Sequence, residues 1–289
     1  MIDIVLISIG ILGLLIGTIT DFQKREVADW VNFGMIFSGL GLRFISAFRI
    51  DWYYFFIPLV WVAVFWAVGM GMYFTGQWGG GDVKMLMALS ALFGTYPFTH
   101  PRLLELFSLP HQSFFMFHFF LNVAVVGSLY GLFWGIGLAI YKRNVFIPAF
   151  KKTFLLIYKW FFLAIILGFF IIVLGFFMQE LFWVTFFLGF LLALLPLLYI
   201  FSKSVEESMI RFMKTSELTE GEWIVDDIYH KETYITGPKE LGITNAQIAL
   251  FKKYKIRGAR VKVGIPFVPA FFLAMIATML FGNLFLLFL

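Results

Sequence analysis

The chain alternates long apolar runs with short polar segments. A bilayer core is roughly 30 Å thick, and about 20 helical residues at ~1.5 Å each cross it. Because the runs are unbroken rather than alternating residue by residue, they predict helices and not barrel strands. Eight helices are predicted, at 3–20, 31–48, 53–75, 83–98, 114–141, 154–177, 181–201 and 265–288.

Some of these runs differ from an ordinary membrane-spanning helix in their length or spacing. The fourth run is short, and only Met178, Gln179 and Glu180 separate the run at 154–177 from the next one. The pair must therefore form a tight hairpin or a re-entrant element. The first run lacks a basic flank and a small-residue cleavage site, so we expect a retained helix rather than a removed leader.

Composition agrees with a membrane protein. Of 289 residues, 61% are hydrophobic, 21% are aromatic and only 13% are charged, which lies outside the usual range of soluble domains. The predicted fold class is an all-α polytopic membrane protein with about six to eight transmembrane helices and a small α+β domain before the last helix. There is no cysteine, so disulfides, thiolate metal sites and a cysteine nucleophile are excluded.

The distribution of lysine and arginine predicts the orientation. Most of the 22 basic residues fall on one side if the amino terminus is outside, and basic residues collect on the cytoplasmic side. We therefore expect a multi-pass protein of the cell membrane, in contact with the lipid bilayer, with both termini outside. The net charge of +5 is mostly a topology signal, and no nucleic-acid partner is expected.

Three parts are expected along the chain: a membrane-embedded catalytic part at 1–201, a small cytoplasmic domain at 202–264, and a final transmembrane helix at 265–289. The cytoplasmic domain is short for independent stability. Its charged composition is consistent with a solvated basic cap or with a docking site.

Inside the cytoplasmic domain, the sequence predicts a charged helix over 204–217 and two strands within 220–237. A further helix is predicted after Thr244. That threonine and Gln247 form a capping-box pattern, and the flanking positions Ile243 and Ile248 fit a hydrophobic staple.

Two acidic residues lie at predicted helix ends on the cytoplasmic side. The run Gly79–Gly81 breaks a helix, and Asp82 can cap the next one, which is an ordinary structural role. Asp21 instead ends the first helix, where its charge faces the negative end of the helix dipole. Acids so close to hydrocarbon are costly, which makes Asp21 a functional candidate.

Paired carboxylates at one membrane face suit an aspartic protease. One carboxylate takes a proton from water while its protonated partner polarises the scissile carbonyl. By helix polarity, Asp82 is the expected base and Asp21 the expected acid. The glycines Gly79, Gly80 and Gly81 would let backbone approach an extended substrate.

These residues carry a family resemblance. The segment GGGD ending at Asp82 matches the GxGD signature of membrane-embedded aspartic proteases, and its continuation to Lys84 resembles prepilin and preflagellin peptidases of the archaeal type. Asp21, followed by Arg25, Val27 and Asp29, is similar to the segment that supplies the other catalytic aspartate of that family. Many members have Pro-Asn where this chain has Ala-Asp. The resemblance covers roughly 1–140, and 262–274 resembles the carboxyl-terminal region of archaeal members.

The resemblance implies an aspartic endopeptidase that removes the short basic leader of type IV pilin or archaellin precursors at the cytoplasmic membrane face. The implied catalytic residues are Asp21 and Asp82, with no metal and no cofactor. The absence of cysteine argues against the zinc-binding insert of many bacterial members. Presenilin-like relatives place a tyrosine before the first aspartate, whereas Thr20 stands there in this chain, which favours leader removal over cleavage within a membrane helix.

The supporting residues carry open alternatives. Glu26 and Asp29 are candidates for binding the basic leader of the precursor, and are equally consistent with interfacial charges beside Lys24 and Arg25. Lys84 either positions the Asp82 side of the site or extends to the interface.

Other classes of function remain in view. A transporter would place acids near helix midpoints and show an inverted repeat, and a non-catalytic scaffold of a pilus or secretion assembly would dock through 202–264. Arg43 is expected to extend to the interface or pair with Asp51. A histidine metal site is conceivable on the outer side, away from both aspartates; its members would be His100, His111 and His118.

Overall fold

The computed structural model describes residues 2–95 and 115–287. The chain divides into two compact units, of which one comprises Met1–Leu132 with Gly264–Leu289 and the other comprises Phe133–Val263. The first unit is therefore assembled from two distant stretches of sequence.

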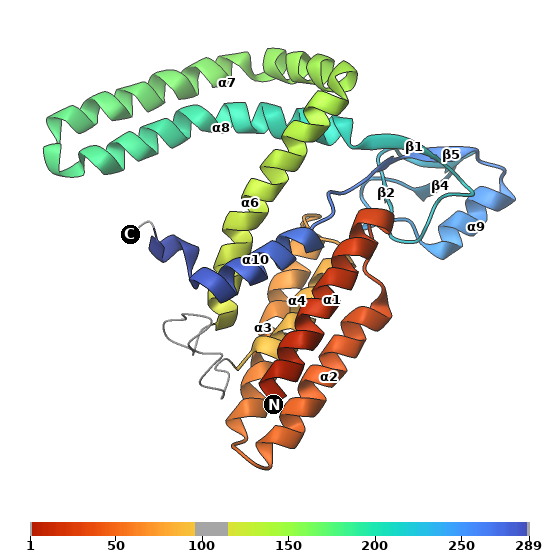
Figure 1. Ribbon diagram of the computed structural model, residues 1–289. Coiled ribbons are helices and arrows are strands. Elements are labelled where there is room, and N and C mark those ends of the chain that lie inside the picture. The colour runs from red at the N-terminus through yellow and green to blue at the C-terminus, as the bar shows by residue number, and fades with distance from the viewer. Residues whose placement is uncertain (1, 96–114, 288–289) are drawn as a thin grey trace. The chain divides into compact units, whose positions relative to one another are not determined.

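The first unit is a bundle of helices (Figure 1). Its elements are α1 (Ile2–Lys24), α2 (Asp29–Ala47), α3 (Tyr53–Phe74), α4 (Gly80–Phe93), the first part of α6 (Phe115–Tyr141), α10 (Val268–Phe281) and η3 (Leu284–Leu287). The short helix α4 lies at its centre, since nearly every residue from Val83 to Phe93 is buried and α4 contacts α1, α2 and α3. A helix that is apolar on all sides belongs in a core.

Arg43 does not extend to the interface or pair with Asp51, so that expectation was wrong. Its side chain is 5% exposed. Its guanidinium donates to the carbonyl oxygens of Ala91 and Thr95, both at 3.0 Å, and also to Leu92 and to the Thr95 hydroxyl. Carbonyls at the end of a helix lack intrahelical partners. In this apolar core, the guanidinium donates the hydrogen bonds that these carbonyls would otherwise lack.

Helix α10 is fixed to α6 at its carboxyl-terminal end. The Asn122 side chain donates to the Thr278 hydroxyl at 2.9 Å and to the Gly282 carbonyl at 2.6 Å, and it accepts from the Leu284 N–H at 2.9 Å. Gly282 ends α10 at φ +70°, a conformation that glycine adopts without strain.

The second unit contains a long helical hairpin. Its elements are the rest of α6, α7 (Arg143–Phe177), η2 (Gln179–Leu181) and α8 (Phe182–Ser208). Of the two predicted alternatives, a tight hairpin or a re-entrant element, the structure has a helical hairpin, although α7 begins well before residue 154. A methyl group at Gly168 would lie 2.4 Å from the Gly189 carbonyl oxygen. Only glycine permits this approach, as is common between helices in lipid.

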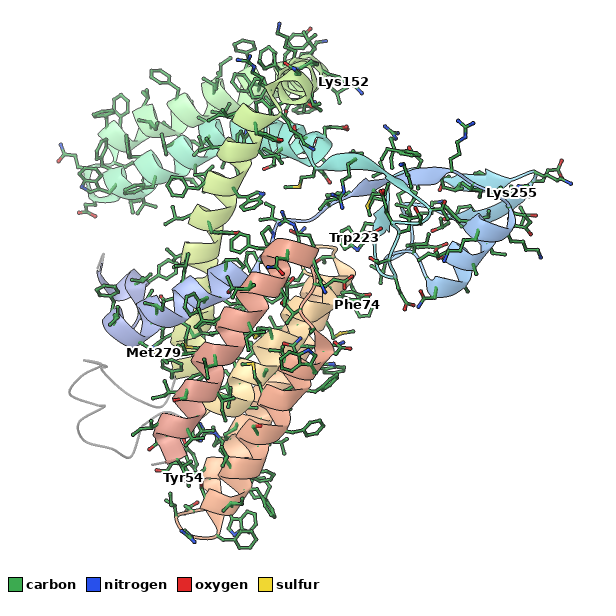
Figure 2. All side chains as sticks on the ribbon, turned by 45° about the vertical axis from the view of Figure 1, so that its right-hand side comes forward. Tyr54, Phe74, Lys152, Trp223, Lys255 and Met279 are labelled. Carbon is green, nitrogen blue, oxygen red and sulfur yellow. The ribbon has the colours of Figure 1, made fainter. Side chains whose placement is uncertain are left out.

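Five helices among the described residues are long and apolar enough to cross a membrane, by length and composition. They are α1, α3, α6, α7 and the continuous stretch Gln179–Ser208, and α10 is a shorter apolar helix. Each of the eight predicted apolar runs corresponds to a helix. Large aromatic and aliphatic side chains are exposed on these helices, except on the buried helix α4 (Figure 2). The chain is a polytopic helical membrane protein with a small α+β part.

The α+β part follows α8. Its elements are β1 (Ile210–Lys214), β2 (Trp223–Ile224), β3 (Ile228–His230), β4 (Thr233–Thr236), α9 (Asn245–Lys253) and β5 (Gly258–Lys262). An antiparallel sheet has the order β1-β5-β2, and β3 and β4 form a hairpin. Its core includes Ile224, Ile243, Phe251 and Val261.

The local predictions for this part were partly right. The helix expected over 204–217 ends at Ser208, because the following residues pair as β1 with the distant strand β5. The helix start is confirmed. Thr244 accepts from the Gln247 N–H at 3.3 Å, its own N–H donates to the Gln247 side chain at 2.8 Å, and the two staple residues are buried.

Candidate functional site

Asp21 lies on the buried face of α1. Leu14, Gly17 and Asp21 follow each other at helical spacing and all are buried, so the carboxylate points into the bundle rather than toward solvent. Its side chain is 6% exposed. The Oδ2 atom accepts a hydrogen bond of 2.9 Å from the backbone N–H of Val268, the first residue of α10.

The end of α1 turns the chain sharply toward α2. Arg25 has φ +59°, a left-handed conformation that costs a non-glycine residue about 1–2 kcal/mol. Its N–H donates to the Asp21 carbonyl at 3.0 Å, and its charge lies within electrostatic reach of the Asp21 carboxylate. A strained arginine at this position is consistent with a supporting role in the site.

Asp82 lies in the first turn of α4, which begins two residues earlier at Gly80. Gly79 is the N-cap residue, and its N–H donates to the Asp82 Oδ2 atom at 3.0 Å. A methyl group at Gly81 would lie 3.4 Å from the Val27 nitrogen, whereas one at Gly80 would have no described atom within 4 Å. Gly81 therefore packs on the segment after Asp21, whereas the space beside Gly80 is open.

The structure brings both aspartates into one region of the first unit. Gly81, directly before Asp82, packs against Val27 in the segment that follows Asp21. Tyr130 of α6 is within electrostatic reach of Asp21. Acids in a largely apolar bundle are costly, which makes both aspartates candidates for a function.

Two contacts join the start of α2 to the start of α4. The Lys84 ammonium lies 2.5 Å from the Asp29 carboxylate, with the lysine 37% and the aspartate 62% exposed. The fully buried side chain of Asn32 donates to the Gly81 carbonyl at 3.5 Å. Lys84 thus contacts the segment that follows Asp21, while Glu26 is exposed near the same turn.

An aromatic cluster adjoins the glycine run. The Trp78 ring lies 5.7 Å from that of Phe267 and 5.5 Å from that of Phe271, and these two phenylalanines are 5.3 Å apart. Sequence reasoning missed Trp78, Asn32 and Val268. The position of Trp78 directly before the glycines was an available signal, whereas a main-chain donor such as Val268 leaves none in the sequence.

Metal ligation has no support in the described residues, where no group of three or more His, Cys, Asp or Glu side chains could hold an ion. His100 and His111 lie outside the described residues, and His118 lies in α6.

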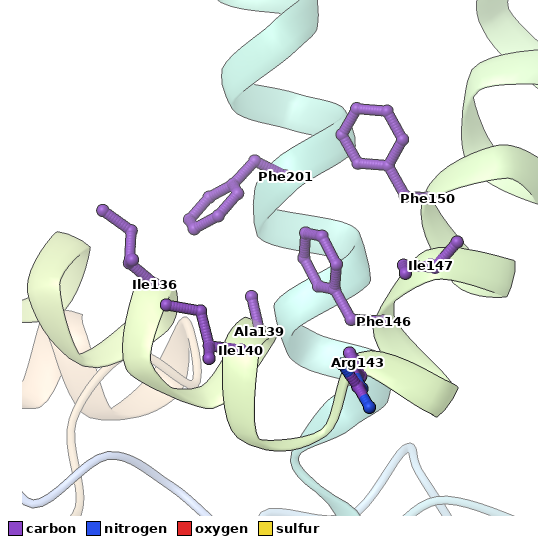
Figure 3. A pocket seen from close by; sticks show the side chains of 8 residues that line it. All are labelled: Ile136, Ala139, Ile140, Arg143, Phe146, Ile147, Phe150 and Phe201. Atoms are coloured by element: carbon purple, nitrogen blue, oxygen red, sulfur yellow. The ribbon is translucent and has the colours of Figure 1, made fainter.

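The second unit has an apolar groove of about 520 Å³ between α6, α7 and α8 (Figure 3). Phe146, Phe150 and Phe201 contribute rings to it, and Arg143 is the charged residue in its lining. None of the residues predicted for the site lies there.

Comparison with known proteins addresses the first unit. Residues 8–132 match the type IV leader peptidase family. The chain is 40% identical over 93 residues to a preflagellin peptidase of Methanocaldococcus jannaschii, which is 30% of this chain and 38% of that protein. It is 30% identical over 124 residues to a preflagellin peptidase of Methanococcus voltae, which is 41% of this chain and 52% of that protein.

A third relative, a preflagellin peptidase of Methanococcus maripaludis, is 34% identical over 85 residues, covering 29% of this chain and 36% of that protein. The chain thus spans about half or less of the length of each relative. No solved structure matches it. The matched family segment includes both aspartates, and the resemblance to prepilin and preflagellin peptidases is confirmed: residues 8–132 are similar to the type IV leader peptidase family.

Proposed function

We propose that this protein is an aspartic endopeptidase that removes the short basic leader from membrane-inserted precursors of the pilin or archaellin class. The observation that carries the proposal is that the glycine run before Asp82 packs on the segment after Asp21, with Gly81 against Val27, inside the segment that matches leader peptidases. The relatives named preflagellin peptidases support this substrate class.

In the proposed reaction, one carboxylate takes a proton from a water molecule, whose oxygen attacks the carbonyl carbon of the scissile peptide. The protonated partner donates a hydrogen bond to the carbonyl oxygen and stabilises the charge that develops there. Collapse of the tetrahedral intermediate breaks the C–N bond, and the departing amine takes a proton from the dyad.

The order of acid and base is less simple than helix polarity suggests. Asp82 accepts an N–H at the start of α4, as expected for the base. Asp21 lies in the last turn of α1 but also accepts an N–H at the start of α10, so helix dipoles do not distinguish the acid from the base. Because such a pair titrates as a unit, we assign the acid and base roles to the dyad jointly.

The open side of the glycine run suits an extended substrate. Gly79 and Gly80 are exposed, and no described side chain fills the space beside Gly80. A precursor whose apolar helix lies in the bilayer would leave its basic leader near Glu26 and Asp29 at the cytoplasmic face. Attraction between these acids and the leader is screened where they are exposed, so their contribution to affinity is modest.

The test is leader removal in liposomes, with a pilin-type and an archaellin-type precursor offered separately. The enzymes are wild type, Asp21→Asn, Asp82→Asn and the control Asp51→Asn. Just before α3, the Asp51 side chain accepts a hydrogen bond of 2.7 Å from the Tyr53 N–H, a role that asparagine can fill. We expect the first two variants to lose activity by about 10²- to 10⁴-fold or more and the control to retain it. Appreciable cleavage by either dyad variant would refute the proposal.

A further inference from the structure

We propose that the first turn of α10 is a positioning element for both aspartates, and that it acts through Val268 and through its contact with Trp78. The inference rests on the proposed function and extends it to a part of the chain outside the family match at 8–132. In Figure 1, α10 begins beside the carboxyl-terminal half of α1, and the two helices are in contact.

The first contact holds Asp21. The N–H of Val268 donates to the Asp21 carboxylate across 247 positions of sequence. Helix amino termini present N–H groups without intrahelical partners, and the residue after Val268 is Pro269, which has no N–H at all. The Val268 N–H makes the 2.9 Å hydrogen bond to the carboxylate, and the N–H of Phe267, just before α10, contributes a further one. A hydrogen bond to a charged group is among the stronger kinds.

The side chain of Val268 fixes where that N–H points. Val268 is fully buried, and its Cγ1 atom lies 3.2 Å from the position that a methyl group on Gly17 would occupy. Gly17 precedes Asp21 by one helical turn on the same buried face of α1. The absence of a side chain at Gly17 allows the start of α10 to approach α1 closely enough to reach the carboxylate.

The second contact holds the loop of Asp82. Trp78 is 6% exposed and packs on Phe267 and Phe271, which flank Val268 along α10. The residue after Trp78 is Gly79, whose N–H donates to Asp82. One turn of α10 thus contacts Asp21 through its main chain and the loop of Asp82 through its aromatic side chains.

A fixed separation between two catalytic groups is worth much more to the reaction than to folding. A displacement of about 1 Å can lower turnover 10²-fold, whereas a net hydrogen bond contributes only about 0.5–1.5 kcal/mol to stability. The positioning role therefore predicts a loss of kcat that exceeds any loss of stability. A merely structural role of α10 predicts that the two change together.

The sharpest experiment removes single N–H groups without changing side chains. Cell-free translation into liposomes would place α-hydroxyisovaleric acid at position 268 or lactic acid at position 270, so that an ester replaces the amide of Val268 or Ala270. Ala270 is the matched control, since it is equally buried and its N–H also makes one 2.9 Å hydrogen bond, to the Phe267 carbonyl. Cleavage of the precursor and thermal unfolding are measured for both.

We expect the ester at Val268 to lower kcat about tenfold or more, with KM within about twofold, and the ester at Ala270 to leave kcat within about twofold. The unfolding temperatures of the two esters should agree. Equal losses of kcat from both esters, or no loss from either, would overturn the inference.

Substitution of Trp78 is a second, independent test, which addresses the contact with the loop of Asp82. We expect Trp78→Leu to lower kcat by about tenfold or more and Trp78→Phe, which keeps a ring against α10, to recover most of it. If Trp78→Leu retains full turnover while folded, the link to the Asp82 loop is wrong. Retention of activity by Asp21→Asn is a different result, because it would refute the proposed function itself and this inference with it.

Discussion

Replacement of Arg43 by methionine tests how α4 is held in the core. Methionine keeps an unbranched side chain about as long as the aliphatic part of arginine and loses every donor. In the native protein, the guanidinium donates hydrogen bonds to the carbonyl oxygens of Ala91, Leu92 and Thr95 and to the Thr95 hydroxyl. All of these lie where α4 ends inside the bundle.

The magnitude follows from these contacts. Each buried polar group left without a partner costs about 1–3 kcal/mol, so three carbonyls set an upper range of about 3–9 kcal/mol. Removal of the guanidinium also removes the cost of burying a charge, and the helix end can relax. We therefore expect Arg43→Met to lower the free energy of unfolding by about 3–5 kcal/mol.

The measurement is a denaturant titration of the purified protein in detergent, followed by tryptophan fluorescence. Arg49→Met is the matched control because Arg49 is exposed in the turn after α2, and we expect it to change the free energy by less than about 0.5 kcal/mol. Arg43→Lys should fall between the two, since an ammonium cannot reproduce the planar fork of donors. A loss below about 1 kcal/mol for Arg43→Met would show that the helix end is satisfied by other groups.

Three further perturbations address the site and the α+β part. Asp29→Lys and Lys84→Asp should each lower cleavage by up to about fivefold, because exposed pairs contribute about 0.2–1 kcal/mol, and their combination should restore it; no recovery would favour leader binding by Asp29. Arg25→Gly should raise the free energy of unfolding by up to about 1 kcal/mol through relief of its left-handed backbone, while cleavage falls. The hydrogen bond from Arg260 holds the pKa of the Asp226 carboxyl below its usual value. That stabilisation is present above the unfolded-state pKa and is lost as pH falls through the folded-state value, so Asp226→Asn should lower the unfolding temperature at neutral pH and not in acid.

The helices could be predicted because each apolar run is a local property of the sequence. Crossing a bilayer requires a continuous apolar stretch, and α1, α3 and α6 therefore start and end near the predicted residues. The α+β part shows the opposite case. Strand β1 exists because it pairs with β5, with Ile210 opposite Lys262, and no local pattern identifies a partner so far along the chain.

Residues with distinctive side chains could be predicted from the sequence, whereas contacts with the main chain or between distant residues could not. Asp21 and Asp82 stand out in the sequence because acids at membrane helix ends are costly and because their flanking motifs resemble a known family. Arg43 was misjudged because its partners are main-chain carbonyls, which every residue has. The contact between Lys84 and Asp29 joins two residues that were each singled out, but nothing in the sequence pairs them.

The position of α10 constrains how the chain can be divided. The matched family segment ends at residue 132, yet the N–H that contacts Asp21 comes from Val268, and Asn122 of α6 holds the far end of α10. Residues 133–263 therefore interrupt a bundle that needs both of its flanking segments. A truncation after residue 132 would keep both aspartates and remove the donor to one of them. If α10 positions the dyad as we propose, the inserted unit can vary in sequence only in ways that leave the Val268 N–H in contact with Asp21.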